Sequence, residues 1–265
     1  MYSALVGITL LSHQMSMAWA GESTVQPTTR QLQMTDGTAI AVDYYAAGRD
    51  RLIVLCPGFL QERKSPRFRE LAGVLSEHFD VAILDFRGTG DSSGHFTYGA
   101  AEPDDLHAVL ADAKTQWGAI GVVGCSLGAA TAIVELARHH DAQSLVAVSA
   151  PMAFEEIENR WWTWRSLTAG WHNAGRWWRF RSGGLWWPKV APQDIVDQLA
   201  PIPVLFIHGT NDPIVYPRHS ERLYALAREP KRLELIPGGT HAEELWRHFP
   251  QQCLPLVVEW FQQTL

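Results

Sequence analysis

The sequence predicts an α/β fold built on a mostly parallel β-sheet with helices on both faces. Short continuous runs of Val, Ile and Leu alternate with longer segments of helical periodicity. Strands that are apolar at every position are typical of a parallel sheet covered on both sides. The first two strand-like segments flank Asp36-Gly37, a pair that favours a tight hairpin, so an antiparallel edge is expected at the start of the sheet.

The expected elements follow one another along the whole chain. The strands are residues 32–34, 39–45, 52–56, 81–85, 120–123, 145–148, 204–208 and 233–236. The helices are residues 67–78, 104–117, 127–139 and 217–228, followed by a helical C-terminal stretch from Ala242 that is interrupted at Pro250 and Pro255. Acidic residues open the helix 104–117, where the helix macrodipole favours negative charge.

Composition narrows the class of protein. The chain has 265 residues, 46% hydrophobic and 19% charged, which is enough to bury a core of its own. Its formal net charge of −6 argues against a nucleic-acid binder. Three cysteines are too few for a disulfide-built scaffold and match no zinc-ligand spacing. Without a run of ~20 apolar residues, no segment is expected to span a membrane as a helix.

The first 28 residues are expected to lie outside the folded domain, which is predicted over residues 29–265. A short apolar run, residues 4–11, precedes Ala18-Trp19-Ala20, which resembles the cleavage site of a secretory signal peptide. The positively charged start of such a peptide is missing, because the first Lys or Arg is Arg30. Two interpretations stay open: a periplasmic or secreted protein cleaved after Ala20, or a cytoplasmic protein with a disordered tail.

The strongest local motif joins a predicted strand to a predicted helix. Residues 124–128 read Gly-Cys-Ser-Leu-Gly, which is G-x-S-x-G in the strand–turn–helix context that this motif requires. Small flanking residues allow a tight turn that projects the Ser126 hydroxyl above the sheet. The backbone N–H of Leu127 then points at the space where an oxyanion would form. We expect Ser126 to be a nucleophile; the alternative is a plain glycine-rich turn.

A serine nucleophile needs a base and a group that orients the base. Asp212 and His241 each follow the end of a predicted strand, so both are expected at the same sheet edge as Ser126. Their order along the chain is the one that accompanies this motif. The alternatives are a turn-forming aspartate and a solvated loop histidine. Asp85 also ends a strand, but the Phe-Arg-Gly after it favours a structural partner for the backbone or an arginine.

A second oxyanion donor is expected in the loop after residues 52–56, which begins Pro57-Gly58-Phe59. Glycine lets this backbone approach the nucleophile, so the N–H of Phe59 is predicted to pair with that of Leu127. The alternative is that Phe59 forms only a hydrophobic lip.

Together these residues resemble the α/β-hydrolase family, and within it the esterase, monoacylglycerol-lipase-like and serine-aminopeptidase-like group. The resemblance extends from about residue 30 to the C-terminus and includes residues 85–92, Asp-Phe-Arg-Gly-Thr-Gly-Asp-Ser. Many members carry histidine where this chain has Pro57.

The resemblance implies that Ser126 attacks a carbonyl group and forms an acyl-enzyme that water then hydrolyses. His241 would carry the proton and Asp212 would hold the tautomer of His241. No metal or organic cofactor is implied. The expected partner is a small-molecule ester. Peptide cleavage, acyl transfer and binding of a hydrophobic ligand without catalysis are the alternatives. A monomer is expected, because the sheet needs no partner to be covered.

Residues 152–200 contain no predicted strand and interrupt the alternation of elements. Eight of the twelve tryptophans lie between Trp161 and Trp187, and residues 159–193 carry six Lys or Arg but no Asp or Glu. Three tryptophans recur every seven residues, which is typical of one helical face, while glycines predict short helices joined by hinges.

In the family that the sequence resembles, a cap covers the active site at this position. Three interpretations stay open. The tryptophans pack on one another with arginines stacked on them. Alternatively, the helical cap docks on anionic lipid. Or it lines a pocket for an anionic ester, with these candidate substrate-binding residues: Trp161, Trp164, Trp171, Trp178 and Arg176.

Two cysteines lie on strands that are expected to be neighbours, roughly 5 Å apart. Cys56 and Cys125 are therefore either a disulfide or redox-sensitive pair, or two buried thiols. Cys253 is expected in the core.

Overall fold

The computed structural model describes residues 25–157, 179–184 and 186–265. Its strands are β1 (Thr28–Gln33), β2 (Ala39–Tyr45), β3 (Arg51–Cys56), β4 (Asp80–Leu84), β5 (Ala119–Cys125), β6 (Ser144–Val148), β7 (Val204–Gly209) and β8 (Lys231–Ile236). Its helices are α1 (Pro66–Leu75), α2 (Glu102–Ala113), α3 (Leu127–His139), α5 (Arg218–Leu226), α6 (Glu244–His248) and α7 (Pro250–Thr264), with 3-10 turns η2 (Pro192–Asp194) and η3 (Val196–Leu199).

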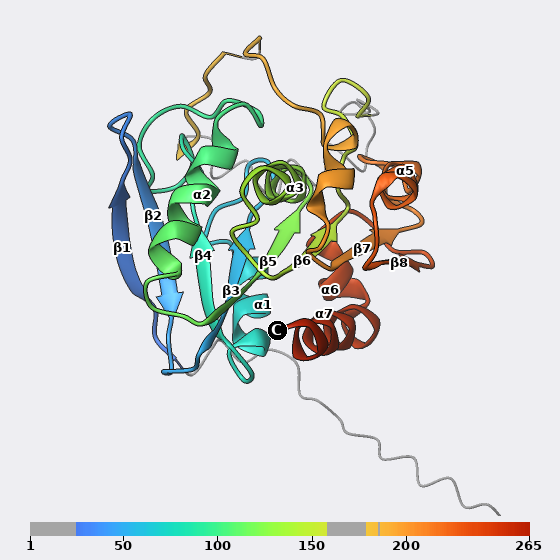
Figure 1. The fold of residues 1–265 in the computed structure, drawn as a ribbon, viewed down its shortest axis with the longest axis horizontal. Helices are drawn as coiled ribbons and strands as arrows, with labels where there is room; N and C mark the ends of the chain where they lie inside the picture. The colour runs from blue at the N-terminus through green and yellow to red at the C-terminus, as the bar shows by residue number, and fades with distance from the viewer. Residues whose placement is uncertain (1–24, 158–178, 185) are drawn as a thin grey trace, which may run out of the picture.

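The strands form one eight-stranded sheet in the order β1-β2-β4-β3-β5-β6-β7-β8. Strand β2 pairs antiparallel with both β1 and β4, and the other neighbours are parallel (Figure 1). The β1–β2 turn places Gly37 at φ +83°, where a side chain would be strained. The predicted α/β fold with an antiparallel N-terminal edge is therefore confirmed.

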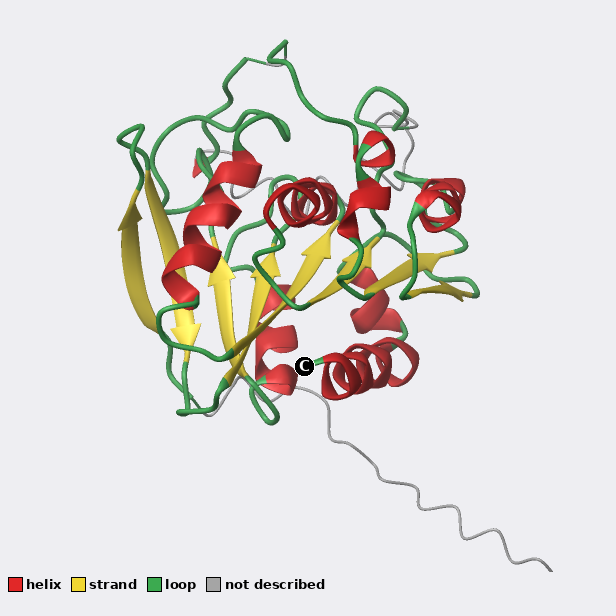
Figure 2. Ribbon diagram, viewed as in Figure 1, coloured by secondary structure: helices red, strands yellow, loops and turns green. Residues whose placement is uncertain are grey.

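Helices cover both faces of the sheet, and each face has its own apolar core. Helices α2, α3 and α5 lie on one face, and α1, α6 and α7 lie on the other (Figure 2). Strand β3 shows how the strands serve both cores. Leu52 and Val54 point into the first core, whereas Ile53 and Leu55 point into the second, as the two-residue period of a strand requires.

One predicted helix break is wrong. Pro255 lies inside α7, which continues to Thr264. A proline inside a helix removes the hydrogen bond to the carbonyl four residues earlier. Both Pro255 and Gln251 are exposed, so water can hydrate that carbonyl and the helix persists.

Two predictions fall on parts of the chain that the structure does not describe. The signal-peptide or tail interpretation concerns residues 1–28, of which 1–24 lie outside the described residues and Thr28 already pairs with Tyr44 in β1. The candidate substrate-binding residues Trp161, Trp164, Trp171, Arg176 and Trp178 lie within 158–178. In the described part of residues 152–200, Trp186 and Trp187 are exposed, and Ser182 forms an isolated bridge with Phe96. Among described residues, no helix has the length and apolar character needed to cross a membrane.

Candidate active site

The turn between β5 and α3 holds Ser126 in a strained conformation, with φ 52° and ψ −118°. Its flanking glycines are needed for space. A Cβ on Gly128 would lie 2.2 Å from the carbonyl oxygen of Cys56, and one on Gly124 would lie 2.5 Å from the Cα of Ala129. The crowded turn fixes the serine at the start of α3, where the helix dipole is positive.

The loops after β7 and β8 bring an aspartate and a histidine to this serine. His241 Nε2 lies 3.0 Å from Ser126 Oγ, and His241 Nδ1 lies 2.6 Å from Asp212 Oδ2. The other carboxylate oxygen of Asp212 accepts hydrogen bonds from the backbone N–H groups of Ile214 (2.9 Å) and Val215 (3.0 Å). The structure thus places the three predicted side chains in one continuous line of hydrogen bonds.

The electrostatics of this line favour an ionised aspartate next to a basic imidazole. Burial raises the pKa of Asp212, but the neighbouring His241 and His208 lower it by more. The net result is a carboxyl pKa well below its usual range. Burial also lowers the pKa of His241, and the Asp212 carboxylate outweighs that effect, so the imidazole pKa lies above its usual range. His241 is therefore a stronger base than a free histidine.

His208 is a second histidine that contacts Asp212. It is fully buried at the end of β7, and its Nε2 lies 2.8 Å from the carbonyl oxygen of Val215 and 3.3 Å from Asp212 Oδ2. A carbonyl oxygen can only accept, so Nε2 carries a hydrogen and Nδ1 faces the Ser220 hydroxyl at 2.6 Å. No sequence pattern pointed to this role.

The two predicted oxyanion donors lie on either side of the nucleophile turn. Leu127 opens α3, and the loop that carries Phe59 approaches so closely that a Cβ on Gly58 would lie 3.3 Å from Ser126 Cβ. Neither N–H donates a hydrogen bond to another described residue. Leu60 follows with φ +60°, so the chain turns tightly just after Phe59.

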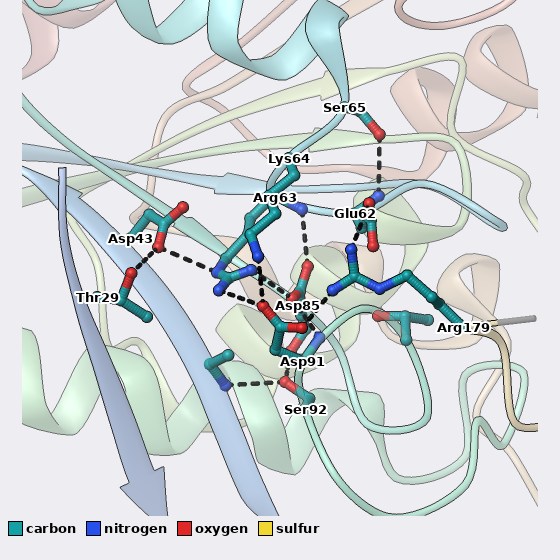
Figure 3. Close-up of polar contacts among 12 residues, drawn as sticks. Thr29, Asp43, Glu62, Arg63, Lys64, Ser65, Asp85, Asp91, Ser92 and Arg179 are labelled. Carbon is teal, nitrogen blue, oxygen red and sulfur yellow. Dashed lines mark hydrogen bonds and ion pairs between the residues drawn. The ribbon is translucent and has the colours of Figure 1, made fainter. Parts of the chain in front are cut away.

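An arginine-centred network holds the segment that follows this loop (Figure 3). The buried Arg63 side chain contacts Asp43 at 3.0 Å, Asp85 at 3.1 Å and Asp91 at 2.6 Å. The backbone N–H of Arg63 also donates to Asp85 at 2.7 Å. Burial raises the pKa of Asp85 to about 6, although Arg63 and the backbone lower it. The predicted structural role of Asp85 is confirmed by these contacts.

Residues 179–181, which follow most of the tryptophan-rich segment, contact this network and its surroundings. Arg179 contacts Glu62 at 3.2 Å and also pairs with Asp91 (Figure 3). The next residue, Phe180, meets Phe59 edge-on with 5.4 Å between ring centroids. Arg181 donates to the backbone carbonyls of residues 92 and 94. Arg179 and Arg181 thus make contacts within the protein that none of the three interpretations of this segment had specified.

A carboxylate that the sequence did not single out lies beside the base. Glu243, two residues after His241, accepts a hydrogen bond of 2.6 Å from Gln61 Nε2 in the loop that carries Phe59. Burial raises the pKa of Glu243, and the charge of His241 lowers it in part. This contact links the two loops that border the serine.

The two cysteines near the serine cannot form a disulfide. β3 and β5 are neighbours, as expected, but Cys56 points into the core beneath α2 and α3 while Cys125 points into the opposite core. Both are free buried thiols, and burial raises the pKa of each. The disulfide interpretation is therefore wrong. Cys253 is buried, as predicted.

The sheet order and the strand–turn–helix serine define an α/β-hydrolase fold, and sequence comparison agrees. The family described as alpha/beta hydrolase fold matches residues 51–166. The uncharacterized protein YqkD of Bacillus subtilis is 32% identical over 215 residues, which are 75% of this chain and 68% of YqkD. The chain belongs to the alpha/beta hydrolase family. The uncharacterized protein YfhR of Escherichia coli K12 is 30% identical over 174 residues, 63% of this chain and 54% of YfhR.

Solved structures share the same fold at low sequence identity. The Pyrococcus furiosus esterase Pf2001 superposes with a TM-score of 0.76 and 21% identity, covering 91% of each chain. The esterase RhEst1 from Rhodococcus sp. superposes with a TM-score of 0.73 and 19% identity, covering 89% of this chain and 99% of the esterase.

Proposed function

We propose that this protein is a serine hydrolase that cleaves carboxylic esters through an acyl-enzyme on Ser126. The observation that carries the proposal is the line of contacts from Ser126 Oγ through His241 to Asp212, at 3.0 Å and 2.6 Å. These distances are within hydrogen-bond reach of a nucleophile, its base and the group that orients the base.

In this mechanism Ser126 Oγ attacks the ester carbonyl carbon while its proton moves to His241 Nε2. The negative charge on the carbonyl oxygen is stabilised by the N–H groups of Leu127 and Phe59. The tetrahedral intermediate collapses, the bond to the leaving oxygen breaks, and His241 returns the proton to the departing alcohol. Water then attacks the acyl-enzyme with His241 again as the base, which releases the acid and restores the serine.

The described residues favour an apolar group on the substrate. Phe59 belongs to an aromatic cluster with Phe96, Tyr98 and Phe180, whose ring centroids lie 5.3–6.4 Å apart. The Phe59 side chain is 41% exposed, so this cluster presents aromatic surface next to the proposed oxyanion donor. A cap over residues 152–200, with Arg176 and its neighbouring tryptophans as further substrate contacts, is part of the proposal.

Hydrolysis of aminoacyl amides is the second candidate, and Glu243 favours it. A carboxylate held beside the base by Gln61 offers a partner for a substrate ammonium group. An alkyl ester offers no positive charge for this carboxylate. The two candidates share the Ser126 chemistry and differ in the group that the pocket accepts.

Labelling with a fluorophosphonate probe tests the serine, and a substrate panel tests the class. We expect the folded protein to be labelled, and we expect Ser126→Ala to abolish labelling. Among p-nitrophenyl esters of rising chain length and aminoacyl arylamides, we expect the esters to be cleaved faster. Failure of the folded protein to react with the probe would favour a non-catalytic binder. Faster cleavage of the arylamides would favour the peptidase.

A further inference from the structure

A second group of titratable side chains lies where α2 packs on the C-terminal half of α3. It consists of His107 on α2, Glu135 on α3 and Asp141 just after α3, and its possible ligand atoms all lie within 4.8 Å of one another. His107 Nδ1 lies 2.5 Å from Asp141 Oδ2 and 3.4 Å from Glu135 Oε1. None of these residues takes part in the proposed hydrolysis.

Glu135 is the unusual member of this group. Its side chain is fully buried, and within the described residues neither carboxylate oxygen has a hydrogen-bond partner. Buried polar groups are nearly always hydrogen-bonded, because an unpartnered one loses its hydration without replacement. Burial, together with the nearby Asp141 carboxylate, raises the pKa of Glu135 to about 9. Neither oxygen of Glu135 is therefore satisfied by a hydrogen bond, and His107 Nδ1 lies 3.4 Å from Oε1.

We propose that His107, Glu135 and Asp141 bind a divalent transition-metal ion of the zinc type. One imidazole nitrogen with two carboxylate oxygens is a donor set that suits zinc, cobalt or manganese, whereas calcium and magnesium prefer oxygen ligands alone. The three residues come from two helices and the following loop, so the ion would join α2 to the end of α3. The half-exposed His107 leaves a route from solvent.

The geometry fits an ion after a small adjustment. Ligands at about 2.0–2.2 Å from zinc stand roughly 3.3–3.6 Å apart in a tetrahedral site, so the 2.5 Å between His107 Nδ1 and Asp141 Oδ2 must widen by about 1 Å. Lys114 contacts Oδ1 of Asp141 and leaves Oδ2 toward His107 and Glu135. Lys114 is therefore a competing cation beside the site. A proton shared between Glu135 and Asp141 is the alternative occupant.

The site is structural and not catalytic. Glu135 lies eight residues after the start of α3, which is about 12 Å along the helix axis from the nucleophile turn. The ion would contact neither Ser126 nor its base. The proposal therefore stands whether or not the protein hydrolyses esters, and its test measures binding and stability.

The test is a zinc titration of the untagged protein after treatment with a chelator and dialysis. We expect isothermal titration calorimetry to show one Zn²⁺ per chain, with a dissociation constant of roughly 1 μM or below. At a hundredfold excess over that constant, the melting temperature is expected to rise by about 5 °C. Absence of binding up to millimolar Zn²⁺ would overturn the proposal.

Variants separate this site from accidental surface binding. We expect His107→Gln and Glu135→Gln each to weaken zinc binding at least ~10-fold. Glu135→Gln retains the size of a buried neutral side chain, so it is expected to fold. The matched control is His248→Gln, which removes an exposed histidine 3.3 Å from Glu244 and leaves the cluster intact. Zinc binding that weakens in the control but not in the cluster variants would show an adventitious ion only and overturn the proposal.

The variant Lys114→Met is expected to strengthen zinc binding, whereas the cluster variants weaken it. Removal of the competing cation is expected to tighten zinc binding by ~10-fold. If Glu135→Gln instead raises the melting temperature of the zinc-free protein and the wild type binds no zinc, the cluster holds a proton, and the metal site is disproved.

Discussion

Two histidine–carboxylate pairs lie near opposite ends of helix α3, and they differ in how their carboxylates are satisfied. The His241–Asp212 contact is 2.6 Å, and the His107–Asp141 contact is 2.5 Å. Asp212 receives two backbone N–H groups on its second oxygen. Beside Asp141 lies a second carboxylate, Glu135, with no donor among the described residues. Similar contacts therefore stand in different surroundings: Asp212 is satisfied by its donors, whereas Asp141, paired with Lys114, has beside it a carboxyl group without a hydrogen bond.

The opposite pKa shifts express this difference. The pKa of Asp212 lies below its usual range, because the two histidines outweigh burial. The pKa of Glu135 is raised to about 9, because burial and Asp141 act together. A third site, around Arg63, shows how the protein can neutralise buried carboxylates with a side chain of its own. There, three aspartates surround one buried guanidinium.

The largest expected effect is on kcat, and it distinguishes the Asp212 pair from the Asp141 pair. Asp212→Asn is expected to reduce kcat by ~10⁴-fold, since the amide cannot hold the catalytic tautomer of His241. Asp141→Asn is expected to leave kcat within about twofold, because it lies far from Ser126. Steady-state hydrolysis of a p-nitrophenyl ester measures both. A comparable loss in the two variants would contradict the division of roles between the pairs.

The second-largest expected effect is on stability, when a substitution removes the cation of the Arg63 site. Arg63→Met is expected to lower the free energy of unfolding by about 3–5 kcal/mol, because it removes the counter-charge of the buried Asp43 and Asp85. Arg179→Met is the control, since it removes a less buried arginine that contacts Asp91 and Glu62, and the loss is expected to be smaller, about 1–2 kcal/mol. Urea denaturation followed by fluorescence measures both. Equal losses would mean that Arg63 is not the main counter-charge.

The pH dependence of activity tests the state of the first pair. In the proposed mechanism His241 must be neutral to accept the serine proton, and its pKa is raised by Asp212. The acidic limb of kcat/KM is therefore expected above the usual histidine pKa of about 6.5, with a tenfold loss per pH unit below it. Measuring kcat/KM between pH 5 and 9 locates the limb, and a midpoint well below 6.5 would argue against the Asp212 effect.

The same pair affects stability in two directions. The raised pKa of His241 contributes stability at pH values below its unfolded-state pKa, and this contribution is lost as the pH rises through the folded-state value. The lowered pKa of Asp212 contributes stability above its unfolded-state pKa of 3.8, and this contribution is lost as the pH falls toward the folded-state value.

The smallest expected effect concerns the second pair without metal. Glu135→Gln is expected to change the free energy of unfolding of the zinc-free protein at pH 7 by about 1 kcal/mol or less, because a neutral amide replaces a neutral carboxyl group. Denaturation in the presence of a chelator measures this. A loss above about 3 kcal/mol would show that Glu135 is ionised and paired, contrary to the contrast drawn between the pairs.

Much of the candidate active site could be predicted because its signals are local. Ser126 stands in a five-residue motif between a strand and a helix. Asp212 and His241 follow strands whose apolar runs are easy to recognise. Parallel strands end at one edge, so the proximity of the three residues follows from the fold class alone. The break expected at Pro255 was wrong because solvent exposure, which the local pattern does not show, decides whether a proline ends a helix.

The sequence by itself determined the order of strands and helices, the antiparallel hairpin at the edge and the serine turn, because these depend on residues close together in the chain. Only the tertiary structure decided which charges meet. Arg63 contacts Asp43 and Asp91, which lie far from it in the sequence. His208 contacts both Asp212 and the carbonyl oxygen of Val215. His107 lies near Glu135, which belongs to another helix. Electrostatic partners depend on distance in space and on burial, and neither is encoded in the spacing of residues along the chain.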